Sequence, residues 1–245
     1  MSKEYLIIHS LDKVEEIVVD NYNEAIRKLI NQVPLQYITN KQEFMKLDFY
    51  VDENVLIPRA DTEILVEEVI EYCNKESKKE YRILDLCSGS GAIGISIAKY
   101  VPNAKVVCAD ISDKALEVSK KNAKINEVDN INFIQTNMFE NIEDEFDIIV
   151  SNPPYIKTEV IKTLDKEVQK EPHIALDGGE TGLDFYEIIV QNAYKYLQKD
   201  GSLFLEIGYD QKDEVEELLH KNENYREIYS KKDLAGNDRI VVAKV

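Results

Sequence analysis

From residue 81 to its end, the chain alternates short apolar segments with longer amphipathic ones. Short apolar runs bounded by turn residues are typical of buried strands, and their alternation with helical patterns indicates a parallel sheet with helices on both faces. The expected fold class is therefore α/β, with a Rossmann-like, mostly parallel sheet of seven strands. We predict strands near residues 82–87, 105–109, 131–135, 146–151, 202–207 and 239–244, another near 225–230, and helices near 92–100, 113–126, 183–198 and 211–220.

The first 80 residues carry different patterns. Apolar residues recur every three or four positions over residues 11–30, which favours one or two amphipathic helices that Pro34 is expected to end. Alternation over residues 43–51 predicts a strand or hairpin, and a helix is expected from about 61 to 73. We therefore expect three parts: a short helical N-terminal lobe (1–40), a hairpin with a connecting helix (41–80) and the Rossmann-like domain (81–245).

Composition argues against several kinds of partner. The formal net charge is -17, and the field of such a chain repels polyanions, so direct binding of nucleic acid is not expected. Cys73, Cys87 and Cys108 form no CxxC pair and the chain has only three histidines, so no metal site is expected. The apolar run at residues 5–8 is too short for a signal peptide or a membrane span. We expect a cytoplasmic protein without membrane association, whose thiols stay reduced.

A glycine-rich loop follows the first predicted strand of the sheet. Gly89, Gly91 and Gly94 form a GxGxxG pattern between a strand and a helix, where glycines allow a tight turn and a close approach of ligand to backbone. Asp110 follows at the end of the next strand, about 20 positions further on, where a carboxylate can accept hydrogen bonds from ribose hydroxyls. The loop by itself fits both a nicotinamide dinucleotide and S-adenosylmethionine.

Asp85 distinguishes between these two cofactors. It lies at the end of the strand, just before the loop, where a carboxylate opposes the pyrophosphate of a dinucleotide but can bind the cationic amino group of a methionine moiety. This position favours S-adenosylmethionine. The alternative is that Asp85 only caps the turn, while the glycines only pack the helix against the strand.

The strand predicted near 146–151 ends in Asn152-Pro153-Pro154-Tyr155, at the carboxyl edge where open α/β sheets bind their ligands. Because the prolines remove two backbone donors, the carbonyls of Asn152 and Pro153 become rigid acceptors that suit an NH2 group. An amide or aromatic amine is a weak nucleophile because its lone pair is delocalised. If the Asn152 side-chain oxygen and the Pro153 carbonyl each accept one N–H, that lone pair is held towards a methyl donor, and the Tyr155 ring can stack on the planar group. We predict a catalytic and substrate-binding motif; the alternative is a proline-stiffened turn.

With further motifs, these residues resemble the protein-(glutamine-N5) methyltransferases that modify the glutamine of the Gly-Gly-Gln motif in class 1 peptide chain release factors. The resemblance runs from about Pro34 to the C-terminus. It implies a class I S-adenosylmethionine-dependent methyltransferase fold and transfer of the methyl group to a glutamine side-chain amide nitrogen. The motifs that carry it include Pro34-Leu35-Gln36-Tyr37-Ile38, Val55-Leu56-Ile57-Pro58-Arg59, Asp61-Thr62-Glu63, Asp110-Ile111-Ser112, Glu171-Pro172, Ala175-Leu176-Asp177-Gly178-Gly179, Leu205-Glu206-Ile207-Gly208 and Ala235-Gly236-Asn237-Asp238-Arg239.

The resemblance also implies roles for individual residues. Asn152 to Tyr155 would hold the glutamine side chain. Arg59 and Glu171 are expected to line the same cleft, with a purely structural ion pair as the alternative. Cys87 stands where many relatives carry glycine, and Asn137 stands where an aspartate is often found, although an asparagine oxygen can still accept from the adenine amino group. The implied cofactor contacts are Asp85, Cys87, Ser88, Gly89, Ser90, Gly91, Asp110, Asn137, Met138 and Asn152.

Three other activities fit part of the sequence. A nucleic acid adenine-N6 or guanine-N2 methyltransferase could use Asn-Pro-Pro-Tyr for any planar NH2, but it predicts a basic or separate recognition region. A non-catalytic, cofactor-binding partner of translation factors would keep the glycine loop but has no need of Asn152. A nicotinamide dehydrogenase fits GxGxxG, yet the sequence shows no obvious His or Lys acid–base partner at a matching strand end.

Overall fold

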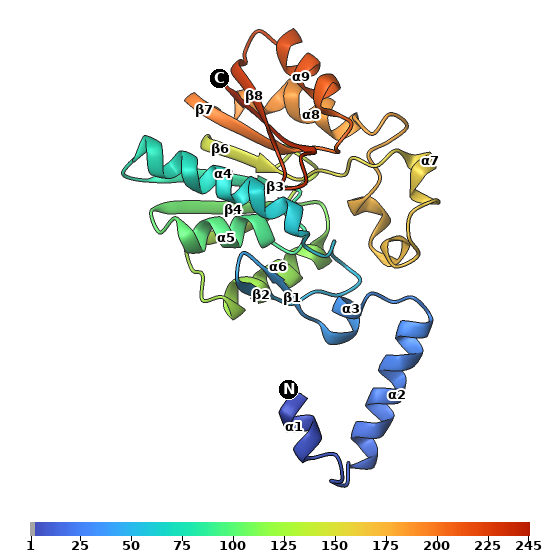
Figure 1. Ribbon diagram of the computed structural model, residues 1–245. Helices are drawn as coiled ribbons and strands as arrows, with labels where there is room; N and C mark the ends of the chain where they lie inside the picture. The colour runs from blue at the N-terminus through green and yellow to red at the C-terminus, as the bar shows by residue number, and fades with distance from the viewer. Residues whose placement is uncertain (1–2) are drawn as a thin grey trace.

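A seven-stranded sheet forms the centre of the protein (Figure 1). The computed structural model describes residues 3–245. In spatial order the strands are β5 (Ile131–Gln135), β4 (Ala104–Asp110), β3 (Tyr81–Leu86), β6 (Phe146–Ser151), β7 (Leu197–Glu206), β9 (Asp238–Lys244) and β8 (Arg226–Lys232). The first five are mutually parallel, and β9 is antiparallel to both of its neighbours. The predicted mostly parallel α/β sheet is confirmed.

Helices cover both faces of this sheet (Figure 1). On one face α4 (Ala60–Glu76) and α5 (Ala92–Tyr100) pack against strand residues such as Ile83, with α6 (Asp113–Ile125) beside them. On the other face α8 (Asp184–Asn192) and α9 (Lys212–Lys221) pack against residues such as Leu84. Because successive strand residues point to opposite faces, a strand buried on both sides must be apolar nearly throughout. This explains the short continuous apolar runs.

Before α4, the described part of the chain contains three helices and a hairpin: α1 (Lys3–Ile8), α2 (Glu16–Ile30), α3 (Leu35–Thr39), β1 (Gln42–Phe44) and β2 (Leu47–Phe49). The hairpin prediction is confirmed, and Phe44 and Phe49 are fully buried in the core beneath α4 and α5. In contrast, α2 extends away from the rest of the molecule (Figure 1). None of the helices in the described residues is both long and apolar enough to cross a membrane.

Two predicted helix boundaries are wrong. The helix expected from residue 11 begins at Glu16, because residues 9–12 form a turn in which the His9 ring pairs with Asp12 (2.6 Å) and the Asp12 amide donates to the His9 carbonyl. The helix expected over 183–198 ends at Asn192, a 3-10 turn follows at Ala193–Lys195, and β7 begins at Leu197. Leu197 continues the helical spacing of the apolar residues of α8. It is buried in the same hydrophobic core as Ile189 and Val190 of α8, but it belongs to a strand.

The region between β6 and α8 contains short elements that the sequence patterns did not predict. They are α7 (Thr158–Ile161) and two 3-10 turns, η1 (Val168–Lys170) and η2 (His173–Ala175). The segment after η2 returns to the end of β6, where Ile156 and Asp177 form an isolated parallel bridge. This region therefore lies beside the carboxyl edge of the sheet.

Candidate active site

The predicted site motifs meet where the strand order reverses. From β3 the chain continues to β4 and β5 on one side and then returns to β6 on the other side of β3. Leu86 and Ser151 are register partners at the ends of β3 and β6, and the Ser151 hydroxyl donates to the Leu86 carbonyl (2.6 Å). Cys87 and Asn152 directly follow these partners. The glycine loop and the Asn-Pro-Pro-Tyr segment thus flank the crevice in which open α/β sheets bind ligands.

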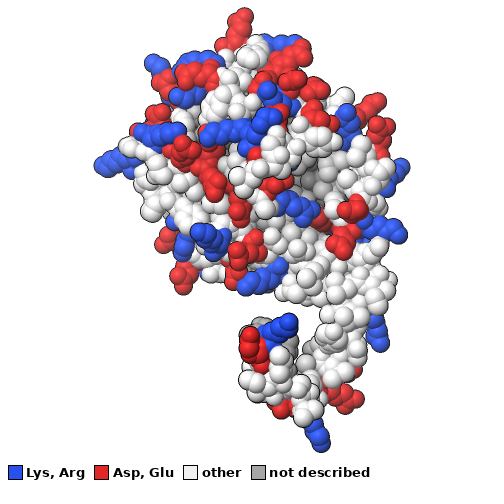
Figure 2. Space-filling model, in the orientation of Figure 1, with Lys and Arg blue, Asp and Glu red and all other residues white. Residues whose placement is uncertain are grey.

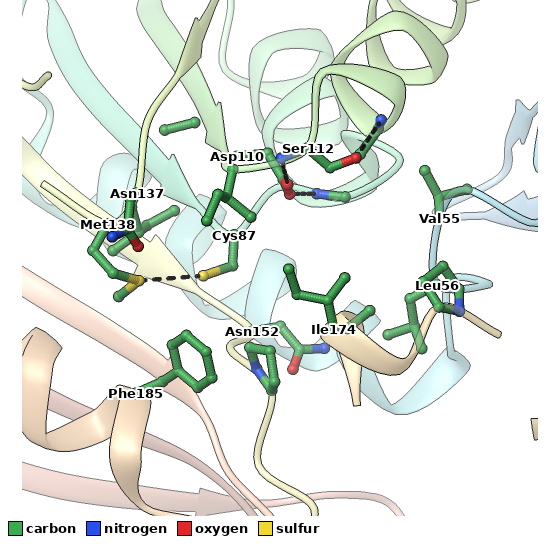
Figure 3. Close-up of a pocket in the computed structure, with 18 of the residues that line it drawn as sticks. Val55, Leu56, Cys87, Asp110, Ser112, Asn137, Met138, Asn152, Ile174 and Phe185 are labelled. Atoms are coloured by element: carbon green, nitrogen blue, oxygen red, sulfur yellow. Dashed lines mark hydrogen bonds between the residues drawn. The ribbon is translucent and has the colours of Figure 1, made fainter. Parts of the chain in front are cut away.

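A cavity of about 840 Å³, including the solvent at its mouth, lies at this crevice (Figure 3). Its wall contains seven residues that the sequence analysis singled out: Cys87, Gly89, Asp110, Asn137, Met138, Asn152 and Pro154. It also contains Val55 and Leu56, from a motif that carries the resemblance, and Ile174 and Phe185, for which no role was predicted (Figure 3). Segments far apart in the sequence, from Asn54 to Phe185, therefore build this cavity together.

Asp110, at the end of β4, is held by two backbone amides. Its Oδ2 accepts a hydrogen bond from the Gly89 amide (2.8 Å) and its Oδ1 accepts one from the Ser112 amide (2.9 Å). Burial raises the pKa of Asp110 above its usual range. Each carboxylate oxygen can accept further hydrogen bonds, so Asp110 can bind two hydroxyl groups of a ligand at the cavity wall.

The conformation of the loop explains its residue types. Gly91 has φ +78°, and a Cβ there would lie 2.1 Å from the Ser119 Oγ, so this glycine allows the loop to pack against α6. Gly89 has φ +53° and its Cβ position has no atom within 4 Å, so this glycine leaves space beside the cavity. Cys87 also lies in the left-handed region, with φ +61°, where glycine is favoured. Ser88, Ser90 and Gly91 are buried and do not line the cavity.

Asp85 lies behind the loop and does not line the cavity. Its side chain is fully buried, and its Oδ2 accepts a hydrogen bond from the Gly94 amide (2.8 Å). Its Oδ1 has no hydrogen-bond partner among the described residues. Burial raises the pKa of Asp85 to about 7. A buried carboxylate with a free oxygen is stabilised by a nearby cation, so Asp85 suits a positively charged ligand group.

Asn137 and Met138 form the wall of the cavity opposite Leu56 (Figure 3). The Asn137 side-chain nitrogen donates to Glu140 Oε1 (3.0 Å), which leaves its oxygen available as an acceptor. The Met138 sulfur lies 4.0 Å from the Cys87 sulfur. Burial raises the pKa of the Cys87 thiol to about 12, so this cysteine is neutral at physiological pH and is a poor nucleophile.

Nowhere in residues 3–245 are three or more His, Cys, Asp or Glu side chains grouped to bind a metal ion.

A second cavity, of about 570 Å³ including the solvent at its mouth, shares Leu56, Asn152 and Ala175 with the first. Arg59, Pro153, Tyr155 and Glu206 also line it. The Tyr155 hydroxyl lies 3.4 Å from Glu206 Oε1, to which it donates. Asn152 thus stands between a cavity walled by the glycine loop and a cavity walled by Pro153 and Tyr155.

The orientation of the Asn152 amide leaves its oxygen available. Its nitrogen donates to the Thr62 Oγ1 (3.3 Å), while its oxygen accepts no hydrogen bond from the described residues. Arg59 and Glu171 form an ion pair beside it, and Glu171 Oε2 accepts a hydrogen bond from the Ile57 amide (3.0 Å). Glu171 is buried and lines neither cavity, whereas the half-buried Arg59 lines the second. Glu171 therefore anchors Arg59 from behind.

Several cavity residues had no signal of function in the sequence. Ile174 and Phe185 are ordinary apolar residues whose place on the wall follows from the turn at η2 and the start of α8. Thr62 and Glu206 belong to motifs that carry the resemblance, but only the structure shows that Thr62 contacts Asn152 and that Glu206 contacts Tyr155. For Glu206, a further signal was its position as a polar residue at the end of a buried strand.

Known proteins resemble this chain in sequence and in fold. The family described as "Methyltransferase small domain" matches residues 60–171. The release factor glutamine methyltransferase of Clostridium acetobutylicum is 45% identical over 98% of this chain and 85% of that protein, and that of Flavobacterium psychrophilum is 44% identical over 94% and 81%. A methyltransferase structure from Pyrococcus furiosus, 16% identical, aligns with a TM-score of 0.59 over 91% of this chain and 98% of that one. At 16% identity, the similarity to the Pyrococcus furiosus structure shows a common fold and nothing about function.

Proposed function

Because the chain belongs to the release factor glutamine methyltransferases, we propose that it transfers a methyl group from S-adenosylmethionine to the side-chain amide nitrogen of the glutamine in the Gly-Gly-Gln motif of class 1 peptide chain release factors. The observation that carries the proposal for the site is the position of Asn152. Its free amide oxygen lies at the junction of two cavities, one suited to a nucleoside and the other suited to a planar side chain.

The residues of the first cavity fit S-adenosylmethionine. Asp110 would accept hydrogen bonds from the ribose hydroxyls, the Asn137 oxygen would accept from the adenine amino group, and Asp85 would stabilise the cationic amino group of the methionine part. The unpartnered Asp85 Oδ1 and the open space at Gly89 support this assignment. When bound, the cofactor supplies an electrophilic methyl group on a sulfonium.

The second cavity supplies the acceptors for the glutamine amide. The Asn152 Oδ1 and the Pro153 carbonyl would each accept one N–H, which would turn the nitrogen lone pair towards the first cavity. The Tyr155 ring would pack on the planar amide. Arg59, held by Glu171, would donate to a carbonyl oxygen of the substrate peptide at the mouth of this cavity. Thr62 holds the Asn152 amide and Glu171 holds Arg59, so both groups are oriented before the substrate binds.

The surface charge favours a protein substrate over a nucleic acid. On the face shown in Figure 2, basic side chains are interspersed with acidic ones. With a net charge of -17, the chain as a whole repels a polyanion. The methyl acceptor is therefore better sought on a release factor than on DNA or RNA.

The affinity for S-adenosylmethionine is expected to depend on pH through Asp85. Only the ionised carboxylate attracts the cationic amino group, and the pKa of Asp85 is raised to about 7 by burial. Affinity should therefore fall as the pH drops through this value, by up to about tenfold per pH unit. Isothermal titration calorimetry between about pH 8 and about pH 6 measures this slope. Asp85→Asn should bind more weakly at the higher pH and flatten the slope; an unchanged slope in that variant would contradict the role of Asp85.

A labelling experiment tests the proposed function. The protein is incubated with radiolabelled S-adenosylmethionine and a purified class 1 release factor, in parallel with a release factor whose Gly-Gly-Gln glutamine is changed to alanine. We expect radiolabel on the natural release factor and none on the release factor that carries alanine in place of this glutamine. Label that survives the glutamine change, or label on added DNA or RNA instead, would refute the proposal.

A further inference from the structure

Gln211 is a buried glutamine that contacts the Asn-Pro-Pro-Tyr segment but lines neither cavity. Its Oε1 accepts a hydrogen bond from the Gly208 amide (3.0 Å). Its Nε2 donates to the carbonyls of Tyr155 (3.1 Å) and Gly182 (3.1 Å). A single side-chain amide thus connects the end of the motif with the turn after β7 and with the segment that precedes α8.

Helix α9 does not explain why a glutamine stands at this position. Gln211 directly precedes α9, but its side chain does not cap the helix, and the residues favoured there are serine, threonine, aspartate and asparagine. Burying a glutamine side chain also costs rotational freedom. Two glycines leave room for it: a Cβ at Gly208 would lie 2.6 Å from the Gln211 Oε1, and a Cβ at Gly182 would lie 2.8 Å from its Nε2. The surrounding loops are therefore shaped around this amide.

The peptide group between Tyr155 and Ile156 is held on both sides. Its carbonyl accepts the hydrogen bond from Gln211, and its N–H donates to the Leu176 carbonyl (3.0 Å). Because a peptide group is planar, two hydrogen bonds on opposite sides fix its orientation. The two prolines before Tyr155 have no N–H with which to anchor the motif. The motif is thus fixed by strand β6 at one end and by this peptide group at the other.

We propose that Gln211 is a positioning residue for methyl transfer: by holding the Tyr155 carbonyl, it keeps the Tyr155 ring and the Pro153 carbonyl in place to receive the acceptor amide. The inference rests on the proposed function, in which Pro153 and Tyr155 bind the glutamine side chain. The first cavity contains none of the three residues to which Gln211 is hydrogen-bonded. Its effect is therefore expected on the acceptor and not on the cofactor.

Two variants test the proposal in the full chain with a release factor as substrate. Gln211→Glu keeps the length of the side chain and the oxygen that accepts from Gly208, but it places a second oxygen, which has no N–H to donate, against two carbonyl oxygens. Gln211→Met removes the polar groups without adding a charge. In both variants we expect kcat to fall about 10- to 100-fold, because the acceptor-binding backbone shifts. The calorimetric dissociation constant for S-adenosylmethionine should stay within about twofold.

Asn130→Asp is the matched control. The Asn130 Nδ2 also donates to two backbone carbonyls, those of Ala98 (3.0 Å) and Ala104 (2.8 Å). Ala104 is the first residue of β4, at the opposite end of that strand from Asp110, and Asn130 lines neither cavity. Because this variant loses the same kind of double hydrogen bond away from the site, it should keep its kcat below the unfolding transition.

The outcomes separate positioning from stability and from the proposed function. Normal kcat in both Gln211 variants, or an equal loss of kcat in Asn130→Asp, would overturn the inference. Weaker cofactor binding with normal kcat in the Gln211 variants would also overturn it. If Gln211→Glu does not fold, Gln211→Met alone decides. None of these results changes the labelling of the natural release factor by the natural enzyme, whose absence would refute the proposed function instead.

Discussion

Asn152→Ala is expected to lower kcat for methyl transfer by about 100- to 1,000-fold, the range observed when one preorganised polar group that acts in the transition state is removed. The affinity for S-adenosylmethionine should change little, because the first cavity keeps Asp110, Asn137 and the glycine loop. The fold should also tolerate the change, since among the described residues the Asn152 side chain forms a hydrogen bond only with Thr62. Single-turnover rates at saturating cofactor, together with a calorimetric dissociation constant, separate the two effects.

Two further variants sharpen this prediction. Asn152→Asp retains an oxygen acceptor, so its rate should lie between those of the natural protein and Asn152→Ala. Asn192→Ala removes a half-buried asparagine at the C-terminal end of α8 that donates to the Ile188 carbonyl, accepts from Lys195 and lines neither cavity, and it should behave as the natural protein does. An Asn152→Ala protein that turns over normally but no longer binds the cofactor would show that Asn152 serves the cofactor instead of the acceptor.

The sheet could be predicted because its signal is local. The central strands β3 and β6 are short apolar runs, and a run such as Phe146–Ser151 must be buried on both faces wherever it lies in the fold. The glycine loop and the Asn-Pro-Pro-Tyr segment could be placed for a related reason: they directly follow such runs, and parallel strands bring their carboxyl ends to one edge. Site motifs made of a few residues adjacent in the sequence can therefore be predicted before the fold is known.

The ends of helices and strands, and the apolar residues that complete the first cavity, depend on contacts between residues far apart in the sequence. Leu197 has the spacing of a helical residue, but pairing with Phe146 makes it the first residue of β7. Ile174 and Phe185 line the first cavity because the segment after β6 folds back over the sheet edge, for which no local pattern exists. Asp85 was predicted from its sequence position to contact the ligand. In the structure it is buried behind the glycine loop and does not line the cavity, so it can act on a ligand only through its charge.

Gly178→Ala is expected to reduce methyl transfer strongly although Gly178 lines neither cavity. The Gly178 amide donates to the Ile156 carbonyl (2.8 Å), and the Ile156 amide donates to the Leu176 carbonyl (3.0 Å). These hydrogen bonds place Gly178 in close contact with the Asn-Pro-Pro-Tyr segment. A Cβ added at Gly178 would lie 2.7 Å from the Tyr155 Cα and 2.9 Å from the Pro154 carbonyl oxygen. Both are backbone atoms, which cannot rotate away, so the Asn-Pro-Pro-Tyr segment must shift. A displacement of this kind costs about 100-fold in rate when it misplaces the reacting groups.

A second crowded glycine, distant from the site, distinguishes this effect from general destabilisation. Gly201 lies in the first half of β7, away from the carboxyl edge, and a Cβ there would lie 2.8 Å from the Gln198 oxygen. Overpacking should lower the free energy of unfolding of both alanine variants by about 1–3 kcal/mol, as urea denaturation can measure. Below the unfolding transition, however, Gly201→Ala should keep its kcat, whereas Gly178→Ala should not. Equal kcat in the two variants would mean that the position of the Pro154–Tyr155 backbone does not limit methyl transfer.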